Sequence, residues 1–386
     1  MSYHTIIATS SFGLESIVAG ELKSLGYENL TVENGRVLFT GSDRDIARCN
    51  IWLRSADRVL LRLAEFKARD FEELFQGALA VPWEEIIPEN GMMHVTGKSI
   101  KSTLSSVPAC QSVVKKAVVN AMKRRYKRSM FPEDGPVYKI EIAFLKDIAT
   151  LTIDTSGAGL HKRGYRLTGG EAPLRETLAA AVIRLSKWKP DRVLADPFCG
   201  SGTIAIEAAM IGKNIAPGIK RTFAAESWPH IPAKIWKTLR DEAQAQINNT
   251  PLEIFASDSD SRVFRSAREN AANAGVSDNI VFQKKPLSEF SSKKKFGCVI
   301  CNPPWGERSG DRESAEALYR EMNEVFTKLD SWSFFILSGH EGFEKHYATK
   351  ATKNRKLYNG KIKCYLYEYF GPFPPRVKEN AGGDDI

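Results

Sequence analysis

The sequence predicts two α/β regions of different kinds. From about residue 170 onward, strand-like runs, short turns and helices alternate, which is typical of a mainly parallel, doubly wound sheet. Residues 1 to about 160 mix strands and helices without this regular alternation, which indicates an α+β fold. Near the end, Asn359-Gly360 separates two strand-like runs and predicts a hairpin, so at least one late strand should run antiparallel.

In the first half, the hydrophobic pattern predicts the elements in order. We expect helices at residues 14–26 and 43–56, the first closed by Gly26, and a long helix after residue 99. The expected strands are residues 3–10, 35–41 and 92–99, with further strands within residues 137–154.

In the second half, three units each consist of a strand, a turn and a helix start. They begin at residues 192, 253 and 294, and a further strand is expected at residues 330–337. Ligands of doubly wound sheets bind beyond the carboxyl ends of the strands. The turns that follow the three strands are therefore the places to look for function.

Composition limits the class of protein. The 386 residues are 42% hydrophobic, with no apolar run of membrane-spanning length and no secretory signal at the start, so we expect a cytoplasmic protein. The net charge of +9 favours a polyanionic partner. Cys298 and Cys301 have no second pair and should be buried structural residues. His340 and His346 lack helical zinc-site spacing, so we expect them at the surface and predict no metal.

The turn after residue 195 contains Gly200-Ser201-Gly202. Read alone, it fits a dinucleotide fingerprint or a tight turn without a ligand. Asp196 precedes the turn; it would repel a pyrophosphate, but it would pair with the ammonium of S-adenosylmethionine, which has no phosphate. Asp258, at the end of the next strand, fits the ribose-binding role, with Glu226 as the second choice.

The sequence Asn302-Pro303-Pro304-Trp305 follows another predicted strand. The Asn302 side chain and the Pro303 backbone each offer a carbonyl oxygen, and together these would accept the two hydrogens of an exocyclic amine. Trp305 offers a flat face for stacking a base. The alternative is a proline-rich turn with a core tryptophan.

Four segments resemble a known family. Residues 196–203 ("DPFCGSGT") and 302–305 ("NPPW") resemble motifs I and IV of class I S-adenosylmethionine-dependent amino-methyltransferases. Residues 160–166 ("LHKRGYR") and 172–181 ("APLRETLAAA") resemble the segment before motif I in THUMP-containing RNA guanine-N2 methyltransferases. Residues 215–228 resemble their insertion after the first helix, which accounts for the late position of Asp258. The resemblance covers nearly the whole chain and is greatest to the bacterial group that methylates large-subunit ribosomal RNA.

The resemblance implies a domain plan and a fold. It places a ferredoxin-like segment at residues 1–55 and a THUMP RNA-binding domain at residues 56–158. A Rossmann-like class I methyltransferase domain, with a mostly parallel sheet and a late antiparallel hairpin, would occupy residues 159–378. Residues 379–386 would be a disordered tail.

The resemblance also assigns site residues. Asn302, Pro303, Pro304 and Trp305 would clamp the target base. The residues expected to bind S-adenosylmethionine are Ala172, Pro173, Leu174, Asp196, Phe198, Gly200, Gly202, Thr203, Asp258 and Asn302. Two positions depart from the family: Pro286 stands where an acid often contacts adenine, and Trp305 replaces the commoner tyrosine.

A basic run in the first half suggests phosphate contacts, because it contains no acid. The alternative is a helix that only promotes solubility. The residues expected to bind RNA are Lys98, Lys101, Ser102, Lys115, Lys116, Lys123, Arg124, Arg125, Lys127 and Arg128.

These observations together predict a transfer of methyl from S-adenosylmethionine to guanine N2, most simply in 23S rRNA. Guanine N2 in transfer RNA and adenine N6 in nucleic acid are alternative substrates, because each base presents a planar exocyclic amine. An RNA-binding ribosome-assembly factor without catalysis is the alternative from another class. No membrane or metal partner is expected.

Overall fold

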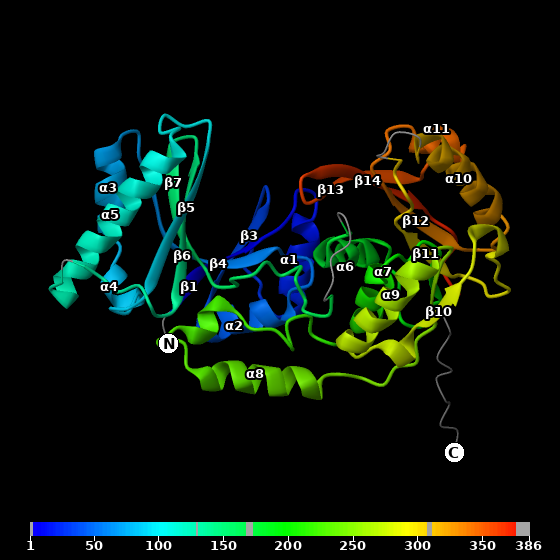
Figure 1. The fold of residues 1–386 in the computed structure, drawn as a ribbon, viewed down its shortest axis with the longest axis horizontal. Coiled ribbons are helices and arrows are strands. Elements are labelled where there is room, and N and C mark those ends of the chain that lie inside the picture. The colour runs from blue at the N-terminus through cyan, green and yellow to red at the C-terminus, as the bar shows by residue number, and fades with distance from the viewer. Residues whose placement is uncertain (1–2, 129, 167–172, 307–310, 376–386) are drawn as a thin grey trace, which may run out of the picture. The chain divides into compact units, whose positions relative to one another are not determined.

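The computed structural model describes residues 3–128, 130–166, 173–306 and 311–375, which form two compact units (Figure 1). Unit 1 contains residues 1–181 and 213–249, and unit 2 contains residues 182–212 and 250–386. In the described part of the chain, each unit is built on a seven-stranded sheet. The domain boundaries expected at residues 55, 158 and 378 stay predictions.

The sheet of unit 1 is continuous, with the strand order β2-β3-β1-β4-β7-β6-β5. Its strands are β1 (His4–Thr9), β2 (Thr31–Glu33), β3 (Arg36–Gly41), β4 (Arg58–Lys67), β5 (Met92–Ile100), β6 (Val137–Leu145) and β7 (Ile148–Asp154). The central strand β4 pairs antiparallel with β1 and β7, and its register shifts between Arg62 and Ala64. Lys146 and Asp147 both have positive φ and turn the chain from β6 to β7.

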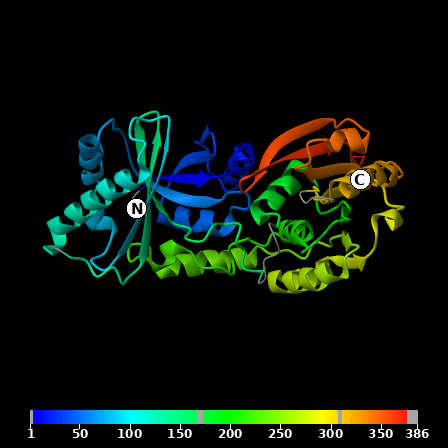
Figure 2. The ribbon, with the colours of Figure 1, turned by 45° about the horizontal axis from the view of Figure 1, so that its top comes forward.

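The helices of unit 1 bury their apolar sides against this sheet. They are α1 (Glu15–Ser24), α2 (Asp43–Trp52), α3 (Phe71–Leu79), α4 (Trp83–Ile86) and α5 (Val107–Tyr126). Figure 2 shows α3 and α5 on one face of strands β5 to β7. Gly26 follows α1 with a φ of +91°, as expected for a residue that closes a helix. The α2 helix ends before residue 56, because Leu53 has extended backbone and enters the core.

Residues 213–249 contribute η1 (Ala224–Ser227) and α8 (Ala233–Ala245) to unit 1. Trp228 stacks on Tyr138 of β6 with the ring centroids 4.8 Å apart, and Phe223 stacks on Trp236 at 5.4 Å. All four side chains are buried. Aromatic burial therefore explains why this segment packs with unit 1.

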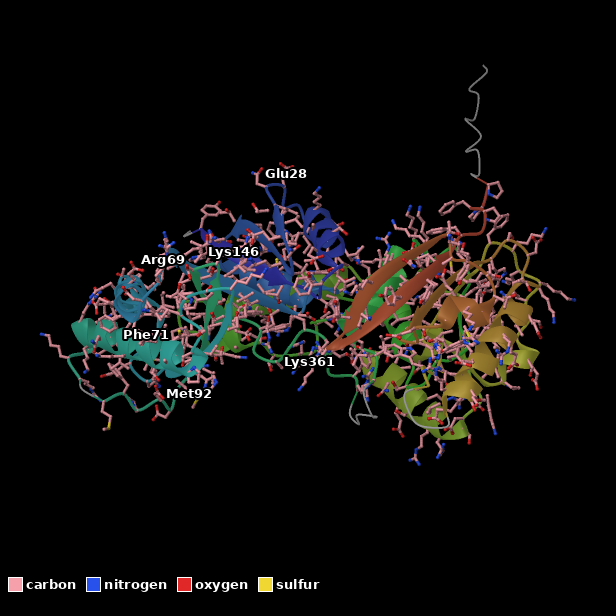
Figure 3. The ribbon with its side chains drawn as sticks, turned by 90° about the horizontal axis from the view of Figure 1, so that it is seen from above. Glu28, Arg69, Phe71, Met92, Lys146 and Lys361 are labelled. Carbon is pink, nitrogen blue, oxygen red and sulfur yellow. The ribbon has the colours of Figure 1, made fainter. Side chains whose placement is uncertain are left out.

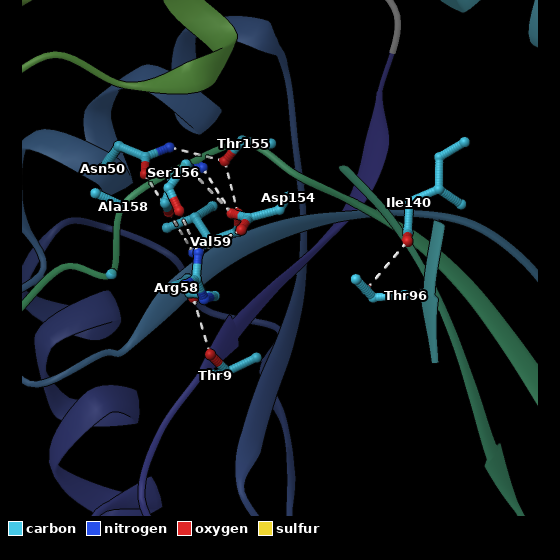
Figure 4. Close-up of polar contacts among 12 residues, drawn as sticks. Thr9, Asn50, Arg58, Val59, Thr96, Ile140, Asp154, Thr155, Ser156 and Ala158 are labelled. Carbon is cyan, nitrogen blue, oxygen red and sulfur yellow. Dashed lines mark hydrogen bonds and ion pairs between the residues drawn. The ribbon is translucent and has the colours of Figure 1, made fainter. Parts of the chain in front are cut away.

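A buried polar network joins α2 to the ends of β4 and β7 (Figure 4). The Ser156 hydroxyl donates to Asn50 Oδ1 at 2.6 Å, and Asn50 Nδ2 donates to Thr155 Oγ1 at 2.9 Å. Arg58 forms an ion pair with the buried Asp154 carboxylate. Because its members satisfy one another, the network fixes this junction rather than destabilising it.

The sheet of unit 2 has the order β10-β9-β8-β11-β12-β14-β13. Neighbouring strands from β10 through β12 pair in parallel, and β14 is antiparallel to both β12 and β13. The strands are β8 (Leu194–Asp196), β9 (Ile254–Asp258), β10 (Val281–Lys284), β11 (Cys298–Cys301), β12 (Ser333–Ser338), β13 (Lys353–Asn359) and β14 (Ile362–Tyr369). The mostly parallel sheet and the late antiparallel hairpin are confirmed.

The helices that connect these strands are α7 (Thr203–Gly212), α9 (Ser261–Ala274), α10 (Asp311–Phe326) and α11 (Phe343–Tyr347), with short η2 (Ser277–Asn279) and η3 (Leu287–Glu289). The α6 helix (Glu176–Leu185) begins in unit 1 and ends in unit 2. No helix in the described ranges is both long and apolar enough to span a membrane. The tail expected at residues 379–386 lies outside the described residues.

Candidate active site

The glycine turn connects β8 to α7. The Gly202 N–H donates to the Cys199 carbonyl at 2.7 Å, and both glycines of the turn have positive φ, +49° at Gly200 and +83° at Gly202. A Cβ on Gly202 would lie 3.3 Å from the Ala267 Cβ, so α7 and α9 pack closely there. A Cβ on Gly200 would meet nothing within 4 Å. Gly200 therefore leaves open space beside the backbone for a ligand.

Asp258 is tied directly to this turn. Its Oδ2 accepts the Gly200 N–H at 3.0 Å, and its Oδ1 accepts the Asp260 N–H, also at 3.0 Å. Since a carboxylate has about four lone-pair sites, both oxygens can accept a further hydrogen bond. The structure thus brings together two motifs that lie far apart in sequence, while the contact of Asp258 with ribose stays a prediction.

Asp196 ends β8 and is 1% exposed. Its Oδ1 accepts the Phe198 N–H at 3.2 Å. Burial, together with the nearby Asp258 carboxylate, raises the pKa of the Asp196 carboxyl to about 8, although the Phe198 N–H partly opposes this rise. A cation that arrived here would relieve the cost of ionising Asp196, which suits the ammonium group of a ligand.

Other residues expected at the cofactor have different surroundings. Glu226, the second choice for ribose, accepts the Phe223 N–H at 3.0 Å and forms an ion pair with Arg240, all within unit 1. The contacts of Glu226 therefore lie in unit 1, whereas Asp258 contacts the glycine turn itself. Ala172 lies outside the described residues, and the following Pro173 and Leu174 belong to unit 1. Phe198 is half-buried and Thr203 is the buried first residue of α7. The cofactor contacts of these residues stay predictions.

Pro286 lies between β10 and η3, with extended backbone at φ −68° and ψ 157°. The preceding residue, Lys285, donates its N–H to the Asp258 carbonyl at 3.0 Å. Backbone groups thus approach the Asp258 side of the turn, while the effect of Pro286 on adenine binding stays a prediction.

Asn302 lies at the same edge of the sheet as Asp196. The parallel strands β8 and β11 align Ala195 with Val299, so Asp196 is beside Ile300, and Asn302 directly follows the end of β11. The carboxyl ends of adjacent parallel strands therefore carry the glycine turn and the Asn302–Trp305 segment side by side.

Trp305 contacts the Asn302 side chain, which sequence reasoning did not anticipate. The indole N–H donates to Asn302 Oδ1 at 3.1 Å and to the Leu337 carbonyl at 3.3 Å. A Cβ on Gly339 would lie 2.5 Å from Trp305 Cε3, so the indole packs directly against this glycine. Because an indole N–H only donates, it can face only the oxygen of the amide. Trp305 therefore holds Asn302 in one orientation.

Tyr319 supports the same segment from α10. Its hydroxyl donates to the Pro304 carbonyl at 2.7 Å. Neither Tyr319 nor Gly339 belongs to a recognisable motif, although a glycine directly after a predicted strand is a weak sequence signal for close packing.

The sequence-based expectation for the two histidines is wrong in part, because His340 is only 6% exposed. His340 Nε2 and His346 Nε2 lie 3.6 and 3.4 Å from the same Glu316 Oε1. A fold that packs α11 onto α10 brings these residues together, which residue spacing does not reveal.

Within the described ranges, no group of three or more His, Cys, Asp or Glu residues is placed to hold a metal ion. Cys298 and Cys301 are buried, as expected.

The cations expected to bind RNA lie on α5 and β5 or in the residues that directly follow these elements. Acids from elsewhere in unit 1 approach several of them, which the acid-free sequence run did not suggest. The pairs are Lys115 with Glu133, Arg124 with Glu84 (3.9 Å), Arg128 with Glu89 (2.6 Å) and Lys98 with Glu141 (2.9 Å). Lys116, Lys123 and Lys127 are exposed.

Two further residues of this set, Arg125 and Ser102, bond to the protein's own backbone. Arg125 donates to the Glu84 carbonyl at 3.1 Å. The Ser102 hydroxyl donates to the Ile100 carbonyl at 3.0 Å, and Lys101 between them has a φ of +50°. RNA binding by all ten residues stays a prediction.

Comparison with known families gives the site its context. A family model described as "RMKL-like, methyltransferase domain" matches residues 163–368, more than half of the chain. The chain belongs to the RMKL-like methyltransferase family. Models of the RlmL ferredoxin-like domain and of the THUMP domain match residues 5–60 and 68–154 of this RMKL-like methyltransferase.

Curated relatives of the RMKL-like methyltransferase cover nearly all of it. YpsC of Bacillus subtilis (strain 168) is 49% identical, over 99% of this chain and 100% of the relative. A Ribosomal RNA large subunit methyltransferase K/L of Syntrophotalea carbinolica is 35% identical, over 97% of this chain and 56% of the relative. The chain thus spans about half the length of the K/L relative.

Solved structures share both units of the RMKL-like methyltransferase. A Listeria monocytogenes structure described as a "predicted N6-adenine-specific DNA methylase" has a TM-score of 0.92 at 49% identity, over 96% of this chain and 97% of the other. The structure of SMU.472 complexed with SAH has a TM-score of 0.90 at 45% identity, over 98% and 100%. Together with the family models, these structures confirm the expected fold class.

Proposed function

We propose that this chain transfers a methyl group from S-adenosylmethionine to the exocyclic N2 of a guanine in large-subunit rRNA. The observation that carries the proposal is the adjacency of Asp196 and Asn302 at the carboxyl edge shared by β8 and β11. The THUMP match and the name of the K/L relative support an RNA substrate and rRNA in particular. A ribosomal RNA substrate also agrees with the expected cytoplasmic location.

The residues of unit 2 fit S-adenosylmethionine, which supplies an electrophilic methyl on its sulfonium. The buried Asp196 carboxyl is suited to its ammonium, and Gly200 leaves room for close approach of the backbone. Asp258 retains acceptor sites for ribose hydroxyls. The SAH in the related SMU.472 structure supports this assignment.

On the substrate side, Asn302 and Pro303 orient the amine. The Asn302 Oδ1 and the Pro303 carbonyl would accept the two amine hydrogens, which leaves the nitrogen lone pair free to point at the methyl carbon. The nitrogen–carbon bond forms as the sulfur–carbon bond breaks, and an amine proton then leaves to solvent. Such a transfer depends mainly on positioning, so it needs no covalent nucleophile.

Adenine N6 is the second candidate substrate, and the description of the Listeria structure favours it. The two carbonyl acceptors would serve either amine equally well. Guanine N2 of transfer RNA would use the same chemistry on a different RNA, so it is tested in the same experiment.

Nucleoside mass spectrometry tests the proposal. The purified protein would be incubated with methyl-deuterated S-adenosylmethionine and, separately, rRNA or tRNA from cells that lack this gene. We expect labelled N2-methylguanosine in the rRNA. Label in tRNA, or on adenine, would correct the substrate. If neither RNA is labelled and calorimetry detects no S-adenosylmethionine binding, the proposed methyltransferase activity is contradicted. That result would favour an RNA-binding assembly factor.

The Trp305→Phe variant tests the orientation of Asn302. Phenylalanine keeps an aromatic ring but lacks the N–H that holds Asn302 Oδ1. A hydrogen bond of this kind is worth about 1 kcal/mol, so we expect kcat to fall roughly five- to tenfold with S-adenosylmethionine affinity unchanged.

Trp332→Phe is the matched control, because the Trp332 indole N–H donates to the Lys294 carbonyl at 2.7 Å, away from the Asn302 segment. If Trp305 acts only by stacking on the base, Trp305→Phe should retain full activity. Full activity in Trp305→Phe would therefore contradict the positioning role.

A further inference from the structure

The β13–β14 hairpin extends past the end of β12, the strand with which β14 pairs. The pairing of β14 with β12 ends where Tyr365 meets Ser338, the last residue of β12. Among the strands that the structure describes, the β14 residues Ile362–Cys364 pair with β13 alone, up to the pair of Asn359 with Ile362. The tip thus lies three residues, about 10 Å, beyond the end of β12.

This overhang lies at the edge of the sheet that carries the candidate active site. The β12 strand is parallel to β11 and aligns Ile336 with Cys301, the residue before Asn302. The next residue after β12 is Gly339, against which Trp305 packs. In the described part of the sheet, β12 alone separates β11 from β14, so the hairpin lies beside the position expected for the target base.

The turn at the tip is tight. Gly360 and Lys361 form its two-residue loop, and Gly360, with a φ of +67°, takes the conformation that glycine adopts without strain. Figure 3 shows Lys361 at the end of the hairpin. The overhang is therefore a regular, well-defined element.

The hairpin and the residues that precede it in the chain are strongly cationic. Between Glu344 and Glu368 the sequence contains no acid and seven cations: Lys345, Lys350, Lys353, Arg355, Lys356, Lys361 and Lys363. Arg355 forms an ion pair with the buried Glu368. Lys353, Lys356, Lys361 and Lys363 are all exposed.

Tyrosines alternate with the lysines on one face of the hairpin. The register places Lys356 opposite Tyr365, and Tyr358 opposite Lys363. Lys356 Nζ lies 5.6 Å from the Tyr358 ring centroid, and Lys363 Nζ lies 5.8 Å from that of Tyr365. We name these four residues the hairpin face.

The hairpin face continues the face of the sheet that α11 covers. The Tyr365 ring is 6.2 Å from that of Tyr367, and Tyr367 packs on Phe343 of α11 at 4.5 Å. Tyr367 is buried in the core and fixes one end of this row of rings. Tyr365, which is nearer the tip of the hairpin, is partly exposed.

We propose that the hairpin face is a second RNA-contact surface, which holds the nucleotides that flank the target base. Exposed ammonium groups attract phosphates, and tyrosine rings between them offer faces on which bases stack without regard to sequence. A base that is swung out of its stack needs its neighbours held nearby, and the overhang is placed for that. This inference rests on the proposed RNA substrate.

Protection of an exposed edge is the competing explanation, since lysines on edge strands discourage aggregation. It accounts for Lys353 and Lys356 on the edge strand β13. It accounts less well for Lys363 on β14 and for the tyrosines that alternate with the lysines. The two explanations predict different effects on RNA affinity.

The double variant Lys356→Gln/Lys363→Gln tests the proposal in the full chain. The probes are a protein-free 23S rRNA transcript and a 20-nucleotide single-stranded RNA. Loss of two phosphate contacts should weaken binding of the short RNA about tenfold at 0.15 M salt and lower the salt slope by about 1.4. KM for the 23S transcript should rise similarly, with kcat and S-adenosylmethionine affinity unchanged.

The matched control is Lys293→Gln/Lys328→Gln. Both residues are exposed in unit 2. They precede β11 and β12, so they lie at the amino ends of the parallel strands, away from the tip of the hairpin. Equal RNA affinity and salt slope in the two double variants would overturn the inference. So would self-association of the hairpin variant in gel filtration with RNA affinity unchanged, which is the result expected of edge protection.

The binding assay separates this inference from the proposed function. A wild-type protein that methylates adenine would correct the proposed base, while hairpin-dependent RNA binding would still support the inference. A wild-type protein that methylates guanine, with identical RNA binding by both double variants, would overturn the inference alone.

Discussion

Asn302→Ala should lower the rate of methyl transfer about 10²–10³-fold, the loss that follows removal of one preorganised hydrogen-bonding group from an active site. The variant removes the oxygen that the Trp305 indole holds in place. S-adenosylmethionine affinity should stay nearly unchanged, because Asp196, Gly200 and Asp258 supply the main expected contacts. Single-turnover kinetics and calorimetry would measure the two quantities separately.

Asn323→Ala is the control for this variant. Asn323 lies on α10, where its side chain donates to Thr349 Oγ1 at 2.6 Å, so the control removes an amide of the same kind away from the edge of the sheet. An unchanged turnover rate in Asn302→Ala would rule out the role assigned to Asn302.

Asp196→Asn should weaken S-adenosylmethionine binding about 10²–10⁴-fold, since breaking one side of a buried charge pair costs about 3–5 kcal/mol. Asparagine has nearly the same shape and can still accept the Phe198 N–H. Calorimetry would measure the loss. Asp278→Asn, at an exposed position in η2, is the control and should bind normally.

The binding of S-adenosylmethionine should also release a proton from Asp196. The pKa of this carboxyl is raised to about 8 in the free protein, so it is protonated at pH 6–7. The ammonium of the ligand favours the ionised form, so affinity should rise with pH by up to tenfold per unit below about pH 7.5. Titrations at pH 6.5 in two buffers of different ionisation enthalpy would detect the proton.

Asp196→Asn should show neither the proton release nor the pH dependence. Proton release that persists in this variant would assign the titration to another group. Wild-type binding without proton release would contradict a protonated Asp196 that ionises against the ammonium.

The second half of the fold could be predicted well, because its signals are local. Asp196 ends a short apolar strand, and the glycine turn and Asn302 follow such strands, so the strand pattern and the motif mark the same place. The rule that ligands bind at the carboxyl ends of parallel strands then brings the motifs together. The Asn359-Gly360 pair likewise predicted the hairpin, although the loop itself consists of Gly360 and Lys361.

The contacts missed by sequence reasoning join residues far apart in the chain. Strand β4 lies between β1 and β7 in the middle of its sheet, and its register with β7 shifts between Arg62 and Ala64, so its hydrophobic pattern is irregular. The packing of Trp305 on Gly339 depends on how β11 and β12 align. The acids that pair with cations of the basic run come from other segments. The net charge of this run alone therefore overstates how many of its cations lack an acidic neighbour.

Residues 213–249 belong to unit 1, although the segments before and after them belong to unit 2. This arrangement affects the order in which the units fold during synthesis. Trp228 covers Tyr138, but it is made about ninety residues later, after β8 and α7 of unit 2. Unit 1 therefore cannot close its core on the ribosome until residue 249 has emerged, although domains generally fold as units while the chain grows. Until then, the surface of Tyr138 that Trp228 covers is open to solvent, and a nascent-chain chaperone would find an apolar target there.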